Sequence, residues 1–480
     1  MSLSGALNTA LSGLGAASRA AGVVSNNLAN ALTEGYGPRE VALSARAGAG
    51  GVRIEGVARN SDEALIGDRR QAAASLGDAG ARARFLAEVE GAVGLPGEPG
   101  ALPDLLARFD SALVSAAARP DAVARLDAVA DAGRRLAEGL AEASARVQTL
   151  RSRADAAIAR TVGALRTGLE QVAELNGRIA TALARGQDAS SLMDQRQQTL
   201  DRIDEIVPLR QMPRAGGQIA LATEGGALLL DGRPAEIAFT PTPVITADMR
   251  IEAGLLGTVT LNGRALDLLE GPLSGGALSG EAAVRDELAV DVQSGLDALA
   301  RDLVERFQTA AVDPTLPPGG AGLFTDGGAP FAGADATGLA ARIALNPAAD
   351  PRQGGESWRL RDGLYAAAPG PAGDGTQLLA MADALGDPRA DASGRFGPGE
   401  RDAAGLAAAL VSDLGVRRQD AEARQSFATA RLDSLVDAEL AKGVDTDAEL
   451  QRLLLYEQLY NANARMIRVV DEMLGTLTRI

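Results

Sequence analysis

The feature that most limits the fold is a long stretch without proline, between Pro120 and Pro208. Apolar residues recur there every three or four positions, as they do on one face of an α-helix. This stripe begins at Leu126 and continues to Leu183, and Gly186 follows it. A helix of about 65 residues would be about 95 Å long, against an ordinary length of about 11–12 residues. The pattern therefore predicts a rod or coiled-coil architecture. It places Leu140 and Leu169 in the core and Arg151 on the surface.

Both ends of the chain are also helical in pattern. We expect one helix over residues 1–34 and helical structure over 401–480, with a turn near Lys442. Between them, helices are predicted from about residue 66 to the Pro/Gly cluster at 94–100, from Pro103, over 192–207 and over 281–311.

Two interior segments differ from the helices. Residues 211–280 and 313–399 are rich in glycine and proline and contain short runs typical of strands. Asp231-Gly232 and Asn262-Gly263 are hairpin signals. Residues 35–65 are expected to be irregular, with a short edge strand at 52–57.

Composition argues against several classes of function. The formal charge of −16 makes nucleic-acid binding improbable, because phosphate binding requires a basic surface. The chain has no cysteine and no histidine, which removes thiolate nucleophiles, the commonest general base and the commonest transition-metal ligand. No motif for catalysis, cofactor binding or metal binding was found, so we expect no such site and no enzymatic activity. No secretory signal and no membrane span is recognisable.

These elements predict a mainly α protein with β insertions, an elongated α+β multidomain chain whose two ends pack together. We expect a terminal helical domain from residues 1–60 and 440–480. A helical rod domain is expected from 61–210, 281–312 and 400–439. A β-rich outer domain is expected from 211–280 and 313–399.

The last helix has apolar residues on two faces. One stripe consists of Leu455, Leu459, Ala462, Met466, Val469 and Met473, and a second column consists of Leu453, Tyr460, Ile467 and Leu474. The first helix has one matching stripe, which includes Leu3, Leu7, Leu14, Val24 and Leu28. An intramolecular coiled coil would cover one stripe on each helix. The remaining face either stays at the surface or packs against other subunits of a polymer.

Asparagines interrupt the stripe of the first helix near its end. Asn26, Asn27 and Asn30 either lie on the surface near the helix end or fix the register of a polymer, as buried polar residues do in coiled coils. Gly35 and Tyr36 are predicted to end the helix, since glycine is the usual residue at a helix C-terminus.

The two ends also resemble a known family. SGLGAASRAAGVVSNNLANALTEGY is similar to the N-terminal signature of the axial flagellar proteins, which include rod, hook and hook-associated proteins. GVDTDAELQRLLLYEQLYNANARMIRVVDEMLGTL resembles their C-terminal signature. SSLMDQRQQTLDRIDEIV and LSGGALSGEAAVRDELAVDVQSGLDALARDL resemble helices of the members at the hook–filament junction. The central LD-x-AI-x-G-x-GFF motif of hook and distal rod proteins does not occur.

The resemblance implies a structural axial protein that joins hook to filament, polymerises through its terminal helices and has no cofactor. Implied partners are like subunits, the hook protein, the third hook-associated protein and an export chaperone, with secretion through the flagellar type III apparatus and no cleaved signal. The alternatives are another axial protein of hook or rod type, or an axial protein that hydrolyses peptidoglycan.

The chain departs from the family pattern at one position. The family usually has one residue between Gly-Tyr and arginine, whereas Gly37 and Pro38 both precede Arg39 here. The geometry of this turn is therefore an open question at the level of sequence.

Overall fold

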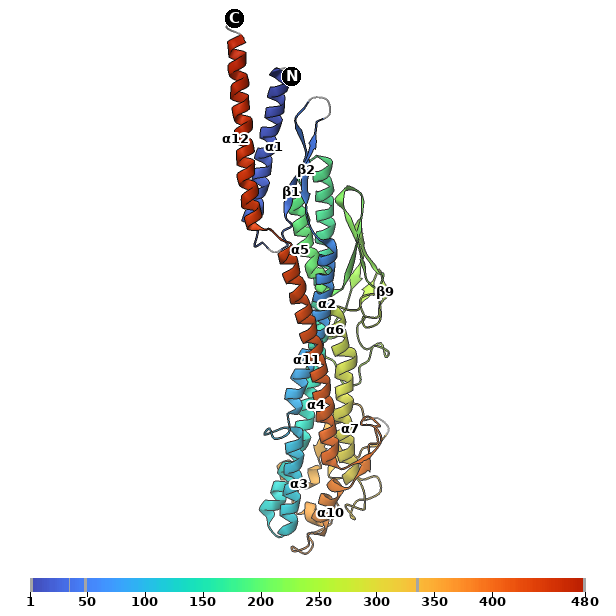
Figure 1. Cartoon of the computed structure of the whole chain (residues 1–480). Coiled ribbons are helices and arrows are strands. Elements are labelled where there is room, and N and C mark those ends of the chain that lie inside the picture. The colour runs from blue at the N-terminus through green and yellow to red at the C-terminus, as the bar shows by residue number, and fades with distance from the viewer. Residues whose placement is uncertain (1–2, 34, 47–49, 334–335, 478–480) are drawn as a thin grey trace.

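The computed structural model shows an elongated molecule and describes residues 3–33, 35–46, 50–333 and 336–477. Long helices run along its length, and both termini lie at the same end (Figure 1). The predicted mainly α fold with β insertions is confirmed.

One helix spans most of the rod. α4 (Val123–Ala184) has 62 residues and is about 93 Å long. Its buried stripe matches the predicted one, and Leu140 and Leu169 are both fully buried. The prediction of one uninterrupted helix is therefore confirmed.

Six further helices complete the rod. They are α2 (Glu63–Val93), α3 (Leu102–Ala118), α5 (Ser190–Ile206), α6 (Ala277–Ala283), α7 (Ala289–Phe307) and α11 (Ala403–Ala441). All except α11 contact α4 directly, and α11 packs along α2 and also contacts α7. Side chains cap two of their N-termini: Asp62 accepts from the Leu65 amide at 3.1 Å, and Asp402 accepts from the Gly405 amide at 2.6 Å.

The strands form small antiparallel sheets. β3 (Leu209–Pro213), β4 (Ile219–Thr223), β5 (Leu228–Asp231) and β6 (Arg233–Pro234) form one sheet in chain order. β7 (Ile237–Ala238), β8 (Thr260–Leu261) and β9 (Arg264–Ala265) form another. Asn262 and Gly263 join β8 to β9 with φ values of 50° and 78°, which confirms the predicted hairpin turn.

Residues 313–399 contain less strand than the sequence suggested. Among the residues described there, the only strands are β10 (Phe324–Asp326), β11 (Ile343–Leu345) and β12 (Arg389–Ala390). The helices α8 (Leu339–Arg342), α9 (Arg359–Asp362) and α10 (Thr376–Gly386) lie in the same segment. β13 (Glu400–Arg401) follows and pairs with β12. The glycines and prolines that suggested strands lie mostly in turns and irregular segments.

The proposed grouping of 211–280 with 313–399 in one outer domain is not what the packing shows. Residues 219–278 belong to a core cluster with α5 and the second half of α4. Residues 323–385 belong to the other cluster, with α3, α7 and the first half of α4. Each segment covers a different part of the same long helix, because neither has a core of its own. The remaining domain boundaries stay predictions.

The terminal segments are a helix pair and a hairpin. α1 (Leu3–Ala29) packs against α12 (Thr446–Leu477) and against the hairpin of β1 (Arg39–Ala45) and β2 (Val52–Arg59). The predicted strand at 52–57 is confirmed by β2, whereas the irregular structure expected over 39–45 was wrong, because β1 forms there. Seven residue pairs form the hairpin ladder, with an irregularity after Ala42.

Arg151 is buried, and its predicted surface position was wrong. The side chain is only 1% exposed, and burial lowers the pKa of its guanidinium to about 10. The guanidinium donates to the backbone carbonyls of Arg285 at 2.6 Å, Thr246 at 3.1 Å and Met249 at 2.6 Å. The sequence periodicity placed Arg151 beside the apolar stripe and therefore at the surface. In the structure, the loop after β7 covers this side of α4.

A buried ion pair strengthens the same contact. Arg285 lies in a π-helical turn (Val284–Leu288) between α6 and α7 and pairs with Asp155 at 2.6 Å. The other Asp155 oxygen accepts from the Thr242 amide at 2.6 Å. The irregular loop is thus fixed to the rod by charged groups on α4 and on the π-helical turn.

Alanine substitutions test this core. Leu140→Ala or Leu169→Ala should lower the free energy of unfolding by about 2–5 kcal/mol, because each leaves a cavity. Arg151→Ala should cost about 2 kcal/mol or more, since buried carbonyls lose a charged donor. Urea denaturation followed by circular dichroism measures all three. Arg153→Ala is the control: this side chain is 60% exposed and should change stability by less than about 0.5 kcal/mol. Equal losses for Arg151→Ala and Arg153→Ala would contradict the buried contact.

Candidate assembly surface and its joint to the rod

Small residues of α1 form its contact with the rest of the molecule. Its buried residues are Ala10, Ala16, Ala17, Ala20, Val23, Val24 and Asn27. At Gly13 a β-carbon would lie 2.8 Å from the Asn463 amide nitrogen of α12, so glycine lets the two helices approach closely. The close packing of α1 against α12 therefore depends on small side chains.

α12 turns its Ile467 column toward α1. Leu453 and Ile467 are half-buried, and Val470, three positions after Ile467, is 4% exposed. Asn463, four positions before Ile467, is the residue that meets Gly13. The column that includes Tyr460 and Leu474 is therefore the one that packs against α1, although these two are still about 40% exposed.

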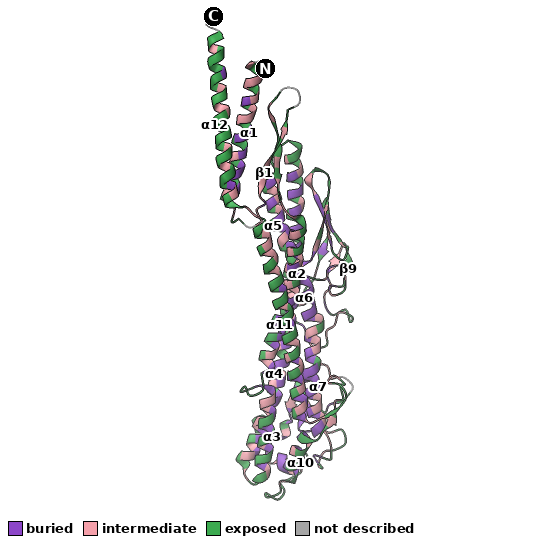
Figure 2. Ribbon diagram, viewed as in Figure 1, coloured by how far each residue is buried: buried purple, intermediate pink, exposed green. Residues whose placement is uncertain are grey.

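The other stripe of α12 faces outward. We call Leu455, Leu459, Ala462, Met466, Val469 and Met473 the outward stripe; its large members are 45–52% exposed. Figure 2 shows α12 exposed along most of its length. An apolar strip of this length is unusual on an isolated soluble protein. The structure thus shows which apolar stripe of α12 faces α1 and which faces outward, a distinction that the sequence did not provide.

The other predicted interface residues lie on α1 and the turn after it. Leu3, Leu7, Leu14, Leu28, Asn30, Gly35 and Tyr36 are half-buried, Val24 and Asn27 are buried, and Asn26 is exposed. α1 ends at Ala29, earlier than predicted, and the Asn30 side chain donates to the Asn26 carbonyl at 2.9 Å. Gly35 has a φ of 72°, the left-handed conformation that suits glycine.

Asn27 forms all its side-chain hydrogen bonds within the subunit. Its amide nitrogen donates to the Arg39 carbonyl at 2.8 Å. Its oxygen accepts from the Tyr36 hydroxyl at 2.8 Å and from the Arg39 amide at 3.0 Å. Asn27 thus holds the end of α1 against the start of β1. That Asn26, Asn27 and Asn30 fix register between subunits stays a prediction.

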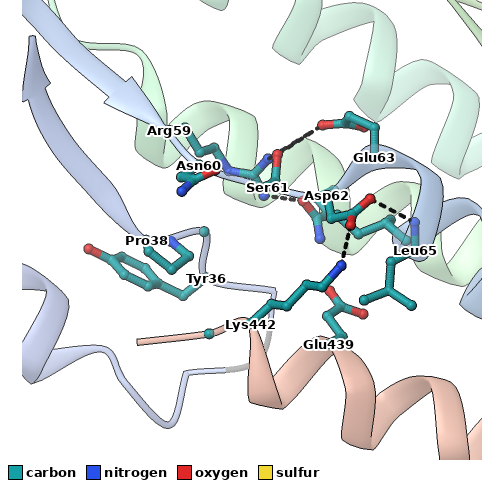
Figure 3. A pocket seen from close by; sticks show the side chains of 14 residues that line it. Tyr36, Pro38, Arg59, Asn60, Ser61, Asp62, Glu63, Leu65, Glu439 and Lys442 are labelled. Atoms are coloured by element: carbon teal, nitrogen blue, oxygen red, sulfur yellow. Dashed lines mark hydrogen bonds and ion pairs between the residues drawn. The ribbon is translucent and has the colours of Figure 1, made fainter. Parts of the chain in front are cut away.

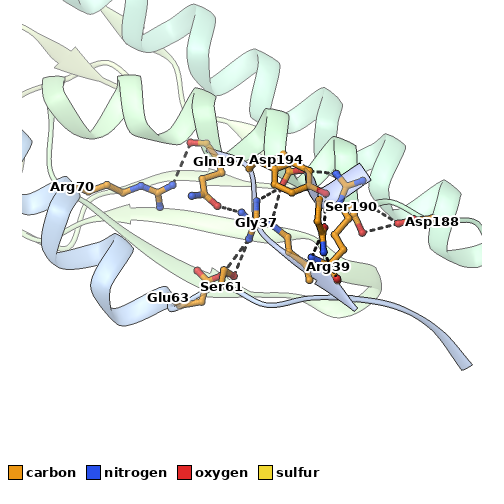
Figure 4. A network of polar contacts seen from close by, with 12 residues as sticks. Gly37, Arg39, Ser61, Glu63, Arg70, Asp188, Ser190, Asp194 and Gln197 are labelled. Atoms are coloured by element: carbon orange, nitrogen blue, oxygen red, sulfur yellow. Dashed lines mark hydrogen bonds and ion pairs between the residues drawn. The ribbon is translucent and has the colours of Figure 1, made fainter. Parts of the chain in front are cut away.

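Arg39 and Arg59 attach the hairpin to the rod through one carboxylate of α5. Asp194 pairs with Arg39 at 2.6 Å and with Arg59 at 2.8 Å, and accepts from the Gly37 amide at 3.4 Å (Figure 4). Arg59 also donates to Gln197. The pairs are largely removed from solvent, so removing one partner would leave a charge uncompensated.

The additional residue in the Gly37-Pro38 turn has a structural role. Gly37 is buried, and a β-carbon there would collide with the Arg59 side chain, which Asp194 and Gln197 hold in place. Arg39 stacks over the Tyr36 ring at 4.9 Å. Burial raises the pKa of the Tyr36 hydroxyl, which stays protonated and donates to Asn27.

A second group of charges joins α2 to α5 and α11. Arg69 pairs with Asp201 at 2.8 Å and with Glu439 at 2.5 Å, and Arg70 pairs with Asp201 at 2.6 Å. Burial raises the pKa of Asp204 to about 7, although Arg70 lies 3.6 Å away and acts in the opposite direction.

The only lysine of the chain bridges the end of α11 and the start of α2. Lys442 pairs with Asp62 at 2.6 Å, and this hydrogen bond lowers the pKa of Asp62. Both residues line a cavity of about 670 Å³ that also reaches Tyr36, Leu65 and Glu439 (Figure 3). We call the region formed by these contacts the joint. Its charged residues are Arg39, Arg59, Asp62, Arg69, Arg70, Asp194, Asp201, Glu439 and Lys442. It connects the terminal helices to the rod mainly through charged and polar contacts.

Sequence patterns did not identify the residues of the joint. Asp194 lies 135 residues from Arg59, and Asp201 lies 132 residues from Arg69, so no spacing rule relates them. The only available signal was that six of the sixteen residues in the predicted helix 192–207 are charged. Among the described residues, no helix is long and apolar enough to span a bilayer.

Comparison with known proteins identifies the family. The model for the flagellar hook-associated protein FlgK helical domain matches residues 87–312. The flagella basal body rod protein model matches 7–36, and the C-terminal model of the flagellar basal body rod FlgEFG proteins matches 441–480. The match at 7–36 covers most of α1, and the match at 441–480 covers α12.

Individual relatives give the same result over the whole chain. Flagellar hook-associated protein 1 of Bacillus subtilis (strain 168) is 24% identical over 513 residues, covering 98% of this chain and 96% of that protein. The protein of the same name from Escherichia coli (strain K12) is 24% identical and covers 64% of this chain and 57% of its own length.

A solved structure of this kind of protein is also similar to the chain. The flagellar hook junction protein FlgK from Burkholderia pseudomallei is 21% identical, with a TM-score of 0.45 over 54% of this chain and 47% of that one. The family assignment rests on the sequence matches, which place a rod-protein signature at each end and the FlgK helical domain between them. The chain belongs to the flagellar hook-associated protein 1 family.

Proposed function

We propose that this chain is the adaptor that joins the flagellar hook to the filament, outside the cell, and that it acts by polymerising through α1 and α12. Its membership of the hook-associated protein 1 family makes it a structural axial protein of the bacterial flagellum. The adaptor role is purely structural, with no enzymatic step.

The outward stripe is the observation that best supports this proposal. α12 contacts α1 along one face only, so its second apolar face has no cover within the subunit. Burial of apolar surface contributes about 25 cal/mol per Å². Packing this stripe against neighbouring subunits would therefore favour assembly, and the same surface would be unfavourable in a free monomer.

The proposal includes four kinds of partner. Like subunits would pack beside one another, the hook protein would lie below and the third hook-associated protein above. An export chaperone would cover the terminal helices before secretion through the type III apparatus. The exposed apolar stripe supports a chaperone, because such a surface favours aggregation until it is covered.

Deletion of the gene tests the adaptor role. Cells should still build hooks but release filament protein into the medium, and a plasmid copy should restore filaments. Electron microscopy of the cell surface distinguishes the outcomes. A strain that lacks hooks would indicate a rod or hook protein instead, and normal filaments would contradict the proposal.

The free subunit should be unevenly protected from hydrogen exchange. We expect fast exchange in α12 and in the first half of α1, because their apolar faces lack partners before assembly. The backbone amides of the buried residues of α4 should exchange slowly and serve as the internal control. Mass spectrometry of dilute monomer gives both values. Protection of α12 equal to that of α4 would show that assembly is not needed to order it.

Charges on α12 should separate assembly from folding. Leu459→Asp or Met466→Asp would place a carboxylate against the apolar surface of a neighbour, which costs several kcal/mol unless it is paired. The monomer should keep its unfolding midpoint, since both positions are exposed. Swimming in soft agar should be lost, with hooks formed and filaments absent.

Two further variants control for position and charge. Asn461→Asp adds the same charge on another exposed face of α12 and should leave swimming intact. Ile467→Asp should instead weaken the contact with α1, seen as a loss of helical circular dichroism in the monomer. Normal swimming with Leu459→Asp and Met466→Asp would rule out the outward stripe as an interface.

A further inference from the structure

An exposed phenylalanine lies on the rod at a distance from the terminal helices. Phe427 of α11 is 71% exposed, whereas Phe109, Phe307 and Phe324 are buried in the core. It borders a groove of about 540 Å³ between α2 and α11, whose floor includes Ala72 and Ala79. Exposed aromatic side chains beside a groove are typical of binding surfaces.

Two arginines flank this side chain on the same face of the helix. Arg424 and Arg431 lie one turn before and one turn after Phe427, are exposed, and line the same groove. Within the described part of the chain, neither arginine forms a hydrogen bond or an ion pair. Asp420 precedes Arg424 by one helical turn. We call Arg424, Phe427 and Arg431 the Arg–Phe–Arg patch. Its charge is opposite to the net charge of the chain.

The first turns of α12 present a complementary surface. Leu450 and Leu454 are 49% and 60% exposed, on a face separate from both the Ile467 column and the outward stripe. Asp447 precedes and Glu457 follows them at steps of three residues, and both are exposed. The two carboxylates form no ion pair with any described residue. We call these four residues the acidic leucine face.

We propose that the acidic leucine face of one subunit docks on the Arg–Phe–Arg patch of a neighbouring copy. This inference rests on the proposed polymerisation and names a second contact for it. Phe427 would lie between the two leucines, and each arginine would pair with one carboxylate. Partial desolvation strengthens such pairs and gives the contact its specificity.

The dimensions of the two surfaces agree. Asp447 and Glu457 are ten residues apart, about 15 Å along the helix, and Arg424 and Arg431 are seven residues apart, about 10 Å. The long arginine side chains can span the difference. Because the two surfaces differ, each copy offers one of each, and such a heterologous contact forms rings or open helical assemblies rather than twofold dimers.

Cross-linking tests proximity directly, because the chain has no cysteine of its own. Ala423→Cys with Leu454→Cys in one chain should give a ladder of covalent oligomers in oxidised, isolated flagella, and a reductant should abolish it. Ala145→Cys with Leu454→Cys is the control, since Ala145 is exposed on α4. No ladder in the first variant, or equal ladders in both, would overturn the inference.

Charge exchange tests specificity. Arg424→Glu with Arg431→Glu should reduce the fraction of cells with filaments at least about tenfold, and so should Asp447→Arg with Glu457→Arg. All four changes together should restore filaments, because the charges are then opposite again. Circular dichroism of each monomer should be unchanged.

The outcomes distinguish this contact from the adaptor role itself. Loss of filaments with Leu459→Asp but not with either charge reversal would overturn the docking contact and leave the proposed function intact. Failure of the fourfold variant to restore filaments would likewise overturn it. If neither Leu459→Asp nor the charge reversals affected filaments, both proposals would be wrong.

Discussion

The continuous apolar stripe of α4 is the constraint on which the rest of the structure depends. Its burial stabilises one continuous helix of 62 residues, and every other rod helix except α11 packs extensively against it. The stripe supplies two successive cores, one shared with α3 and α7 and one shared with α5 and the first sheet. The small sheets are therefore attachments to a helix and have no independent core. An elongated shape follows from this arrangement, because no second layer covers the whole length of the helix.

The terminal helices are held in a different way. Between α1 and α12, small residues of α1, including alanines, valines and one close glycine, meet the Ile467 column of α12. At the joint, by contrast, the contact involves Asn27, two arginines and Asp194. Polar contacts need defined partners, so they determine which segment meets which. Apolar contacts between small residues are less specific and leave larger side chains, such as Leu459, on the outside. In the proposed assembly, folding within the subunit and association between subunits use separate faces of α12.

Periodicity was enough to predict the helices, since each long helix has a stripe that repeats every three or four residues. The Asn262-Gly263 pair predicted a hairpin turn, because that turn requires left-handed residues. Sequence patterns failed where contacts are distant in the chain. Arg151 was placed at the surface because no local pattern shows the loop that surrounds it. The role of Asp194 was not predicted, because its partners lie more than 130 residues away. The two stripes of α12 were both visible in the sequence, but only the position of α1 shows which one is covered.

The chemical difference between rod and joint has a mechanical consequence. Close-packed apolar side chains resist displacement steeply, since a shift of less than an ångström forfeits much of their attraction. The energy of a charge pair falls only in inverse proportion to distance, so the pairs of Arg39, Arg69 and Lys442 tolerate small changes of angle. The chain passes between the terminal helices and the rod twice, before β1 and after α11, and these two segments keep them connected. Bending stress applied to this subunit would therefore concentrate at the joint, which yields elastically, while the rod stays rigid.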